Sequence, residues 1–299
     1  MKKLLFPILL MSCIGTLLSC EKEVNFNLPT DVANKLVVEG SIEVGEHPII
    51  YLSNSFGFNQ NFNQELYSTL FAHGAIITVS EGNRSIQLIE DSIEVEDTKF
   101  YFYTINQNDP LSQDFIGEFG KTYSLRIDYN KKTYESVTTI PYINPIDSIW
   151  SDTLKDDIEG KPELRELFIK FTDPDSLGNA YKEYTKVNSN PFMTAKYTVS
   201  NDAIFNGVEV KTSISNGYDK VDTTDSDSRA YFKVGDTVVL KWCAIDQNVF
   251  KFWRTLEFAT GTVGNPFSTP IKATSNISNE ALGVWAGYGT TFDTLIIKD

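Results

Sequence analysis

The feature that most constrains the fold is a long series of short β-type runs with almost no helical periodicity. From Lys35 onward, runs of alternating or β-branched residues are separated by turn sequences such as Glu81-Gly82-Asn83 and Asn130-Lys131. Of the 299 residues, 41% are hydrophobic and 22% are charged, which is the balance of a globular chain with packed cores. The sequence therefore predicts a folded, mostly β protein.

A first β-rich region is expected over residues 35–140. Its predicted strands are Leu36–Glu39, Ile49–Leu52, Ala75–Val79, Ile86–Ile89, Phe100–Ile105, Tyr123–Asp128 and Thr133–Thr139. About seven short strands in roughly 100 residues are typical of an immunoglobulin-like β-sandwich. This region has no Cys or Trp, the hallmarks of antibody domains, so the expectation concerns architecture alone.

A second β-rich domain is expected over residues 146–299, because Pro141 and Pro145 end the preceding strand. Its predicted strands are Ile146–Trp150, Leu164–Thr172, Tyr181–Val187, Ala195–Val199, Val208–Ser213, Ala230–Phe232, Thr237–Ala244, Leu282–Tyr288 and Phe292–Ile297. One amphipathic helix is expected over residues 247–259, since apolar side chains recur there on one face. Asp246 can cap its start.

The chain opens with an export signal over residues 1–19. Lys2 and Lys3 precede an apolar run from Leu4 to Leu18, which is shorter than the ~20 residues that a spanning helix needs. The run ends in Leu17-Leu18-Ser19-Cys20, which resembles the lipobox of bacterial lipoproteins. We therefore expect cleavage before Cys20 and acylation of its thiol, which would anchor the protein in a membrane. Cys13 is the weaker site, because cleavage there would leave an apolar tail.

Residues 20–34 are expected to form a lipidated tether. Glu21-Lys22-Glu23 resembles the acidic signal that sends some lipoproteins of certain Gram-negative bacteria to the cell surface. We therefore expect an outer-membrane location, with the cell surface favoured over the periplasmic face. The formal net charge of −14 argues against nucleic acid and anionic lipid surfaces as partners.

The candidate binding residues lie in one long aromatic and amide-rich segment, Asn54–Phe71. Its aromatic side chains include Phe56, Phe58, Phe62 and Tyr67. A loop of this length is commonly functional, and aromatic rings with amides suit a glycan or peptide ligand. The alternative is that these rings cover the edge of the sandwich.

The motifs of common enzymes and cofactor sites are missing from the sequence, so we expect neither catalysis nor a cofactor. His47 and His73 lack the spacing of zinc hydrolases, and no metal site is predicted. Calcium at Asp173–Asn179 or at the acidic run 219–227 is left open, although neither has the pattern of an EF-hand loop. Cys243 is expected to be a small buried side chain in a strand.

An ordered series of short motifs resembles one family of lipoproteins. The motifs are Lys35-Leu-Val-Val-Glu-Gly-Ser-Ile, Gly120-Lys-Thr-Tyr-Ser-Leu-Arg-Ile, Ile140-Pro141, Ile146-Asp147-Ser148, Phe171-Thr-Asp-Pro174, Phe250-Lys-Phe-Trp253, Asn265-Pro266-Phe267, Ser275-Asn276-Ile277 and Gly283-Val-Trp-Ala-Gly287-Tyr288. They resemble the domain-of-unknown-function family 4249, across nearly the whole mature chain. The sequence Asn279-Glu280-Ala281 departs from the glycine-rich turn that is commoner there.

The resemblance implies a role beside TonB-dependent outer-membrane receptors, because such genes tend to neighbour each other. The expected function is therefore a non-enzymatic accessory or ligand-capture component of nutrient uptake. The alternative is a free-standing surface module or adhesin that binds glycans or peptides. The same resemblance implies four candidate O-glycosylation sites, each of which follows an Asp. They are Ser92, Ser148, Thr153 and Thr294.

Overall fold

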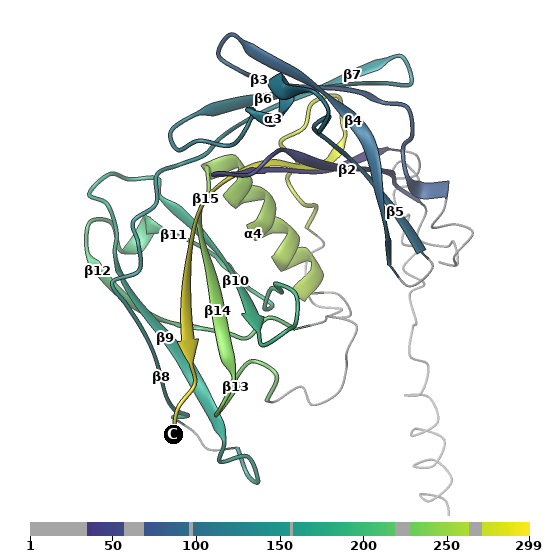
Figure 1. Ribbon diagram of the computed structural model, residues 1–299. Coiled ribbons are helices and arrows are strands. Elements are labelled where there is room, and N and C mark those ends of the chain that lie inside the picture. The colour runs from purple at the N-terminus through teal and green to yellow at the C-terminus, as the bar shows by residue number, and fades with distance from the viewer. Residues whose placement is uncertain (1–34, 57–68, 96–97, 156–157, 219–227, 263–270) are drawn as a thin grey trace, which may run out of the picture.

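The computed structural model describes residues 35–56, 69–95, 98–155, 158–218, 228–262 and 271–299, and it is mostly β (Figure 1). Most of its strands belong to one bent sheet, in the order β11-β10-β14-β15-β1-β2-β5-β4-β3-β6-β7. A smaller sheet of β12, β9, β13 and β8 packs beside it. The mostly β fold class with sandwich-like layers is confirmed.

The N-terminal sandwich is made by the first half of the chain. Its strands are β1 (Leu36–Glu43), β2 (Ile49–Asn54), β3 (Ile76–Glu81), β4 (Arg84–Val95), β5 (Thr98–Thr104), β6 (Thr122–Tyr129) and β7 (Lys132–Thr139), with the short helix α3 (Pro110–Gln113). The long strand β4 joins its two layers, because Arg84–Leu88 pair with β3 and Ile89–Val95 pair with β5. One core lies between the layers.

The C-terminal sandwich packs a second pair of layers. Its strands are β8 (Ser148–Thr153), β9 (Leu164–Thr172), β10 (Ala180–Val187), β11 (Val199–Asn201), β12 (Glu209–Ile214), β13 (Phe232–Lys233), β14 (Thr237–Ala244) and β15 (Leu282–Ile296), with a 3-10 turn η3 (Asp202–Ile204). Its core includes Phe171, Tyr181 and Trp242, whose rings contact one another.

The helix α4 (Gln247–Gly261) covers the other face of β10, β14 and β15 (Figure 1). Val249 and Phe252 are buried there, as the apolar periodicity predicts. The Asp246 carboxylate accepts hydrogen bonds from the backbone N–H groups of Asn248 and Val249, at 2.8 and 3.0 Å, and so caps the helix. The predicted helix is confirmed. In the part of the chain that the structure describes, no helix has the length and apolar character needed to cross a bilayer.

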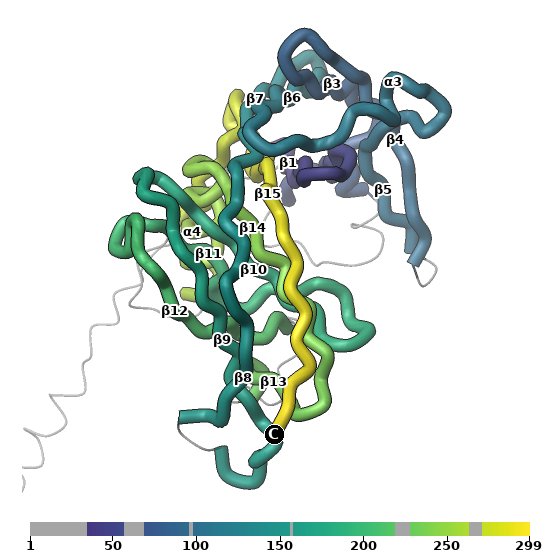
Figure 2. Tube along the Cα trace, turned by 60° about the vertical axis from the view of Figure 1, so that its left-hand side comes forward, coloured from purple at the N-terminus to yellow at the C-terminus, as the bar shows by residue number. Residues whose placement is uncertain are grey.

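The last strand, β15, belongs to both halves of the molecule. Leu282–Tyr288 run parallel to β1, and Gly289–Ile296 run antiparallel to β14. In Figure 2 the strand passes from the N-terminal layers down to the C-terminus. The prediction of two separate strands here, Leu282–Tyr288 and Phe292–Ile297, is wrong. Glycine and threonine interrupt its apolar pattern, but pairing with β1 along the first half and with β14 along the second keeps the whole segment extended.

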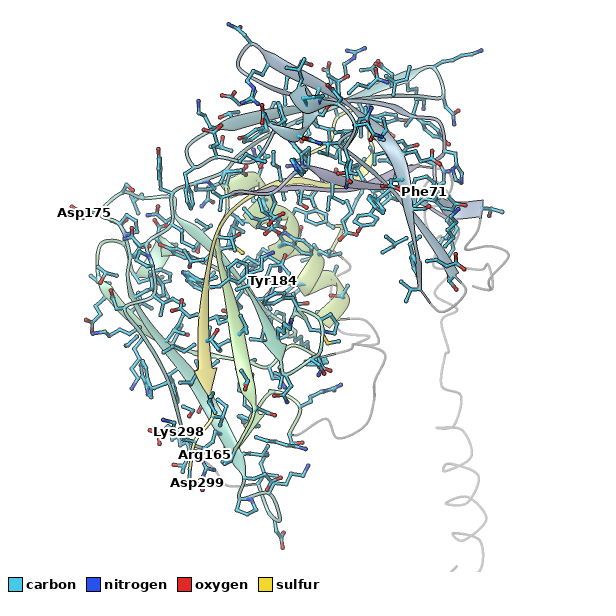
Figure 3. The ribbon with its side chains drawn as sticks, viewed as in Figure 1. Phe71, Arg165, Asp175, Tyr184, Lys298 and Asp299 are labelled. Carbon is cyan, nitrogen blue, oxygen red and sulfur yellow. The ribbon has the colours of Figure 1, made fainter. Side chains whose placement is uncertain are left out.

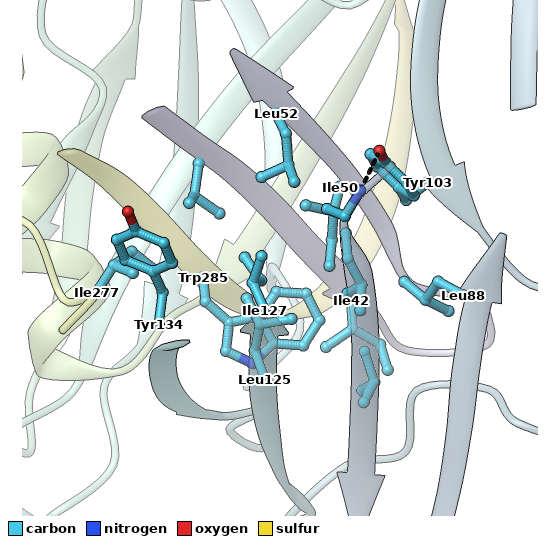
Figure 4. Close-up of a cluster of buried hydrophobic side chains, with 14 of the residues drawn as sticks. Ile42, Ile50, Leu52, Leu88, Tyr103, Leu125, Ile127, Tyr134, Ile277 and Trp285 are labelled. Atoms are coloured by element: carbon cyan, nitrogen blue, oxygen red, sulfur yellow. Dashed lines mark hydrogen bonds between the residues drawn. The ribbon is translucent and has the colours of Figure 1, made fainter. Parts of the chain in front are cut away.

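Trp285 fixes β15 inside the N-terminal core (Figure 4). The side chain is completely buried, and its indole N–H donates to the backbone oxygen of Tyr123 at 3.0 Å. Gly40 of β1 leaves the space that the indole occupies, since a Cβ there would lie 2.8 Å from the ring. The backbone N–H and C=O of Trp285 also bond to the Asn276 amide. A segment from the end of the chain therefore completes the first sandwich.

A buried polar junction joins the two halves at the start of α4. The Thr138 hydroxyl of β7 donates to Asp246 Oδ2 at 2.7 Å and accepts from the backbone N–H of Gly287 at 2.8 Å. The backbone N–H of Thr139 also donates to Asp246 Oδ2. One carboxylate thus caps the helix and holds the edge of the other sandwich.

Two predicted strands are largely wrong. The strand expected at Ala230–Phe232 is displaced, because β13 begins only at Phe232. Residues Ala195–Val199 were expected to be extended, but β11 begins only at Val199. Ala195 is buried without belonging to a strand, so its apolar character marks packing and not a strand.

Two glycines test how closely β1 and β15 approach. Gly283 has a φ of +104°, and a Cβ at this position would lie 1.8 Å from the carbonyl oxygen of Val38. Gly45 has a φ of +79°, with open space around its Cβ position. Gly45→Ala should lower the free energy of unfolding by about 1–2 kcal/mol through backbone strain. Gly283→Ala should cost a further ~1–3 kcal/mol, because the two strands must move apart. Urea unfolding of both variants measures the difference, and equal losses would contradict the close approach.

Candidate functional site

The candidate site is a groove on the inner side of the bend in the large sheet. We call it the corner groove. It has an aromatic end of about 610 Å³ and an apolar end of about 720 Å³, and Glu39, Trp253 and Val284 line both. Such volumes are in the range of small-molecule and peptide pockets.

The outward face of β1 forms one wall of the corner groove. Val38 and Ile42 point into the N-terminal core, so the alternation of the strand turns Val37, Glu39 and Glu43 the other way. The helix α4 and strands β10 and β14 supply the facing wall. In Figure 3 Tyr184 of β10 lies beside α4, within this corner.

The aromatic end contains one ion pair surrounded by rings. Lys241 Nζ of β14 lies 2.5 Å from Glu43 Oε1 of β1, so the pair crosses between the two halves of the molecule. The same ammonium lies 5.3 Å from the centroid of the Tyr184 ring and 6.0 Å from that of Phe192. Both are cation–π distances, and Lys241 is therefore held by a carboxylate and two ring faces.

Glu39 lies where the two ends of the groove meet. Within the described residues its side chain makes no hydrogen bond and no ion pair, unlike that of Glu43 four residues along. It keeps access to solvent, yet the neighbouring walls displace enough water to raise the pKa of its carboxyl. Tyr51 is opposite it on β2, where burial and the charge of Glu39 raise the pKa of the phenol. A carboxylate with no partner in the described part of the chain thus lies between the two ends of the groove.

Trp253 is held in a fixed position at the junction of the two ends. Its indole N–H donates to the Tyr288 hydroxyl at 2.9 Å. Lys182 Nζ of β10 lies 4.1 Å from the ring centroid, on the side of the sheet that α4 covers. A ring fixed both at its N–H and across its face provides a rigid surface for a ligand.

Beneath Trp253 is a buried ion pair. Lys182 is 1% exposed and Glu257 of α4 is 5% exposed, with 3.5 Å between Nζ and Oε1. Thr198 links them, because its hydroxyl accepts from Lys182 at 2.8 Å and donates to Glu257 at 2.6 Å, and its backbone N–H donates to Glu257 Oε2. This cluster attaches α4 to the sheet.

Burial dominates the protonation of the neighbouring groups. Loss of hydration lowers the pKa of Lys182 to about 8, although the adjacent Glu257 acts in the opposite direction. Burial raises the pKa of Glu183, the next residue on β10, to about 8. Burial also raises the pKa of the Cys243 thiol to about 12, so that it is unreactive at neutral pH. The prediction of a buried Cys243 in a strand is confirmed.

Comparison with known proteins decides the family. The domain of unknown function DUF4249 matches residues 21–292 of the chain, well over half of its length. The chain belongs to this family. No curated protein and no solved structure matches it.

Of the predicted binding residues in this DUF4249 member, only Phe56 can be placed. It is 38% exposed, just after β2. Phe58, Phe62 and Tyr67 lie outside the described residues, as does Cys20. Phe71, at the end of the aromatic segment, stacks on Tyr103 with ring centroids 5.6 Å apart. The last ring of the segment therefore packs against the sandwich.

Three charged residues in or beneath the groove, Glu39, Lys182 and Glu257, were not predicted from the sequence. Glu257 follows Trp253 by four positions and so lies on the apolar stripe of the predicted helix, which is a signal for a buried carboxylate with a partner. Lys182, within a predicted strand, is the corresponding cation. Glu39 carried no such signal, because a single glutamate in an alternating strand usually faces solvent.

The acidic loop Asp173–Asn179 is hydrogen-bonded within the protein. Asp173 is 2% exposed and accepts from the Tyr181 hydroxyl at 2.6 Å and from the backbone N–H of Gly207. Asp202 accepts from the backbone N–H groups of Gly178 and Asn179. The other acidic run, 219–227, lies outside the described residues.

The two histidines have separate partners. His47 Nδ1 lies 3.0 Å from the Phe115 carbonyl oxygen, and His73 Nδ1 lies 2.7 Å from Glu90 Oε1. Within the described ranges, no three His, Cys, Asp or Glu side chains converge as ligands for a metal ion.

A double-mutant cycle tests the buried pair under Trp253. Lys182→Met leaves the Glu257 carboxylate buried without its cation, and we expect a loss of about 3–5 kcal/mol in the free energy of unfolding. Lys182→Met combined with Glu257→Gln should cost less than the sum of the two single changes. Urea unfolding gives all four values.

The control for this cycle is Lys170→Met. Lys170 pairs with Glu209 at 3.1 Å on the exposed surface, so its loss should cost at most about 1 kcal/mol. Additive effects in the cycle, or equal losses at Lys170 and Lys182, would show that the pair does not hold α4.

Proposed function

We propose that the mature protein is anchored in the outer membrane by acyl chains on Cys20 and serves a TonB-dependent receptor as a non-enzymatic accessory protein that captures its ligand. The observation that carries the ligand-capture part is the corner groove, with its aromatic rings and with Glu39, whose carboxylate has no partner among the described residues. The lipobox supports the anchor, and Glu21-Lys22-Glu23 supports the cell surface. The receptor as partner rests on the family resemblance.

The buried reactive groups support binding without catalysis. The Cys243 thiol is buried and has a raised pKa, and Lys182 is hydrogen-bonded to Thr198 and paired with Glu257. These groups are buried in the packed interior, and none of them lines the groove. The groove side chains that do face a ligand are aromatic rings, a carboxylate and an ion pair, which suit recognition.

A second candidate function is a free-standing surface module or adhesin for glycans or peptides. The observation in its favour is Phe56, exposed at the beginning of the aromatic segment Asn54–Phe71. Such a module would need no receptor. The two functions therefore differ in whether the protein isolated from its native envelope carries a receptor with it.

Replacement of the acceptor thiol tests the anchor. Cys20→Ala should abolish labelling with palmitate and move the protein from the membrane to the soluble fraction, because acyl chains supply about 0.8 kcal/mol per buried CH₂. Fractionation and labelling of cells measure both effects. Cys13→Ala is the matched control and should remain membrane-bound and labelled. A Cys20→Ala variant that is labelled and sedimented as fully as the unaltered protein would contradict the anchor.

Isolation of the lipidated protein from its native envelope in mild detergent tests the partner. We expect an outer-membrane receptor of the TonB-dependent class to co-purify with it. A lipoprotein that is anchored but consistently solitary would reject the accessory role and favour the free-standing module.

A further inference from the structure

Among the described residues, the Glu39 carboxylate has no hydrogen bond and no ion pair, although it lies where the two ends of the corner groove meet. The side chain is exposed, and the walls around it displace enough water to raise the pKa of its carboxyl. Two lysines line the groove, and neither offsets this charge. Lys241 is bound to Glu43, and Lys272 at the apolar end makes no ion pair with Glu39 among the described residues. The charge of Lys272 instead helps to lower the pKa of the exposed Glu280 carboxyl.

The surroundings of Glu39 add aromatic and apolar contacts. On one side are the rings of Tyr51 and Trp253, which attract cations through their faces. On the other side, the apolar end is lined by Val37, Leu256, Ile271 and Leu282. A ligand that satisfies both ends has a positive group with apolar groups beside it.

We propose that the corner groove binds an oligopeptide, with a lysine or arginine side chain at Glu39 and a neighbouring apolar side chain in the apolar end. The two ends share three lining residues and are together larger than one side chain requires, which favours a ligand of several residues over a simple amine. A neutral sugar would offer no cation to Glu39 and would place hydroxyls against the apolar end. This inference rests on the ligand-capture part of the proposed function and names the class of ligand.

The Lys241–Glu43 pair gives the groove a second feature. Both side chains line the aromatic end, and each already has the other as its charged partner. A peptide cation therefore meets one free carboxylate and not two, which fixes where its side chain lies. The charge of the whole chain, −14, also favours approach of a cationic ligand.

The test is a titration of the purified full-length protein in detergent with two capped peptides. The first is acetyl-Leu-Ala-Lys-Leu-amide, and the second has acetyl-lysine in place of lysine, so that only the charge is removed. We expect the lysine peptide to bind at least tenfold more tightly by calorimetry. Glu39→Gln should remove this preference, while Glu94→Gln, the same charge change on the exposed part of β4, should leave it unchanged.

A second variant separates the two ends of the groove. Ile271→Ser, at a 42% exposed position of the apolar end, should weaken both peptides by a similar factor and keep the preference for lysine. Equal affinity for the two peptides, retention of the preference in Glu39→Gln, or no binding of the lysine peptide up to millimolar concentration would overturn the proposal. Tighter binding of a neutral oligosaccharide such as maltotriose would also overturn it. Because the titration needs neither a membrane nor a receptor, its failure is distinct from failure of the anchor or of receptor binding.

Discussion

The structure depends on one strand that satisfies two sheets. The first half of β15 pairs with β1 near the start of the folded chain, and the second half pairs with β14. Trp285 buries its indole in one core, while Val284, Ala286 and Tyr288 face the other way and pack under α4. Since neither sandwich is complete without this strand, their relative position is set by backbone hydrogen bonds and not by a flexible linker.

The corner groove follows from that arrangement. A sheet that continues from β1 through β15 to β14 and β10 must place the outer face of β1 opposite α4. Asp246 and Thr138 hold the start of the helix, and the buried Lys182–Glu257 pair holds a later turn. Trp253, between these two attachments, is therefore fixed. Glu43 and Lys241 come from the two halves and meet across the bend.

Local features of the fold could be predicted from the sequence, and distant ones could not. Local sequence patterns predict the short alternating strands, the amphipathic helix and the buried Cys243. The parallel pairing of Val37 with Leu282 joins residues that are far apart in the chain, and no local pattern encodes it. For the same reason Glu39 reads as an ordinary solvent-facing strand residue until α4 is placed opposite it. The aromatic segment Asn54–Phe71 drew attention by composition, whereas the described groove is built from residues scattered through the chain.

The most direct test of this account is native-state hydrogen exchange with the Thr138→Val variant. The valine removes the hydroxyl that joins Asp246 to Gly287, so the free energy of opening should fall by a similar amount in β1 and in β14. Thr212→Val, at an exposed strand position, should change neither. Equal losses in both strands would show that the two halves open as one unit through β15. A loss confined to one strand, with the other unchanged, would contradict the shared strand as the element that holds the groove together.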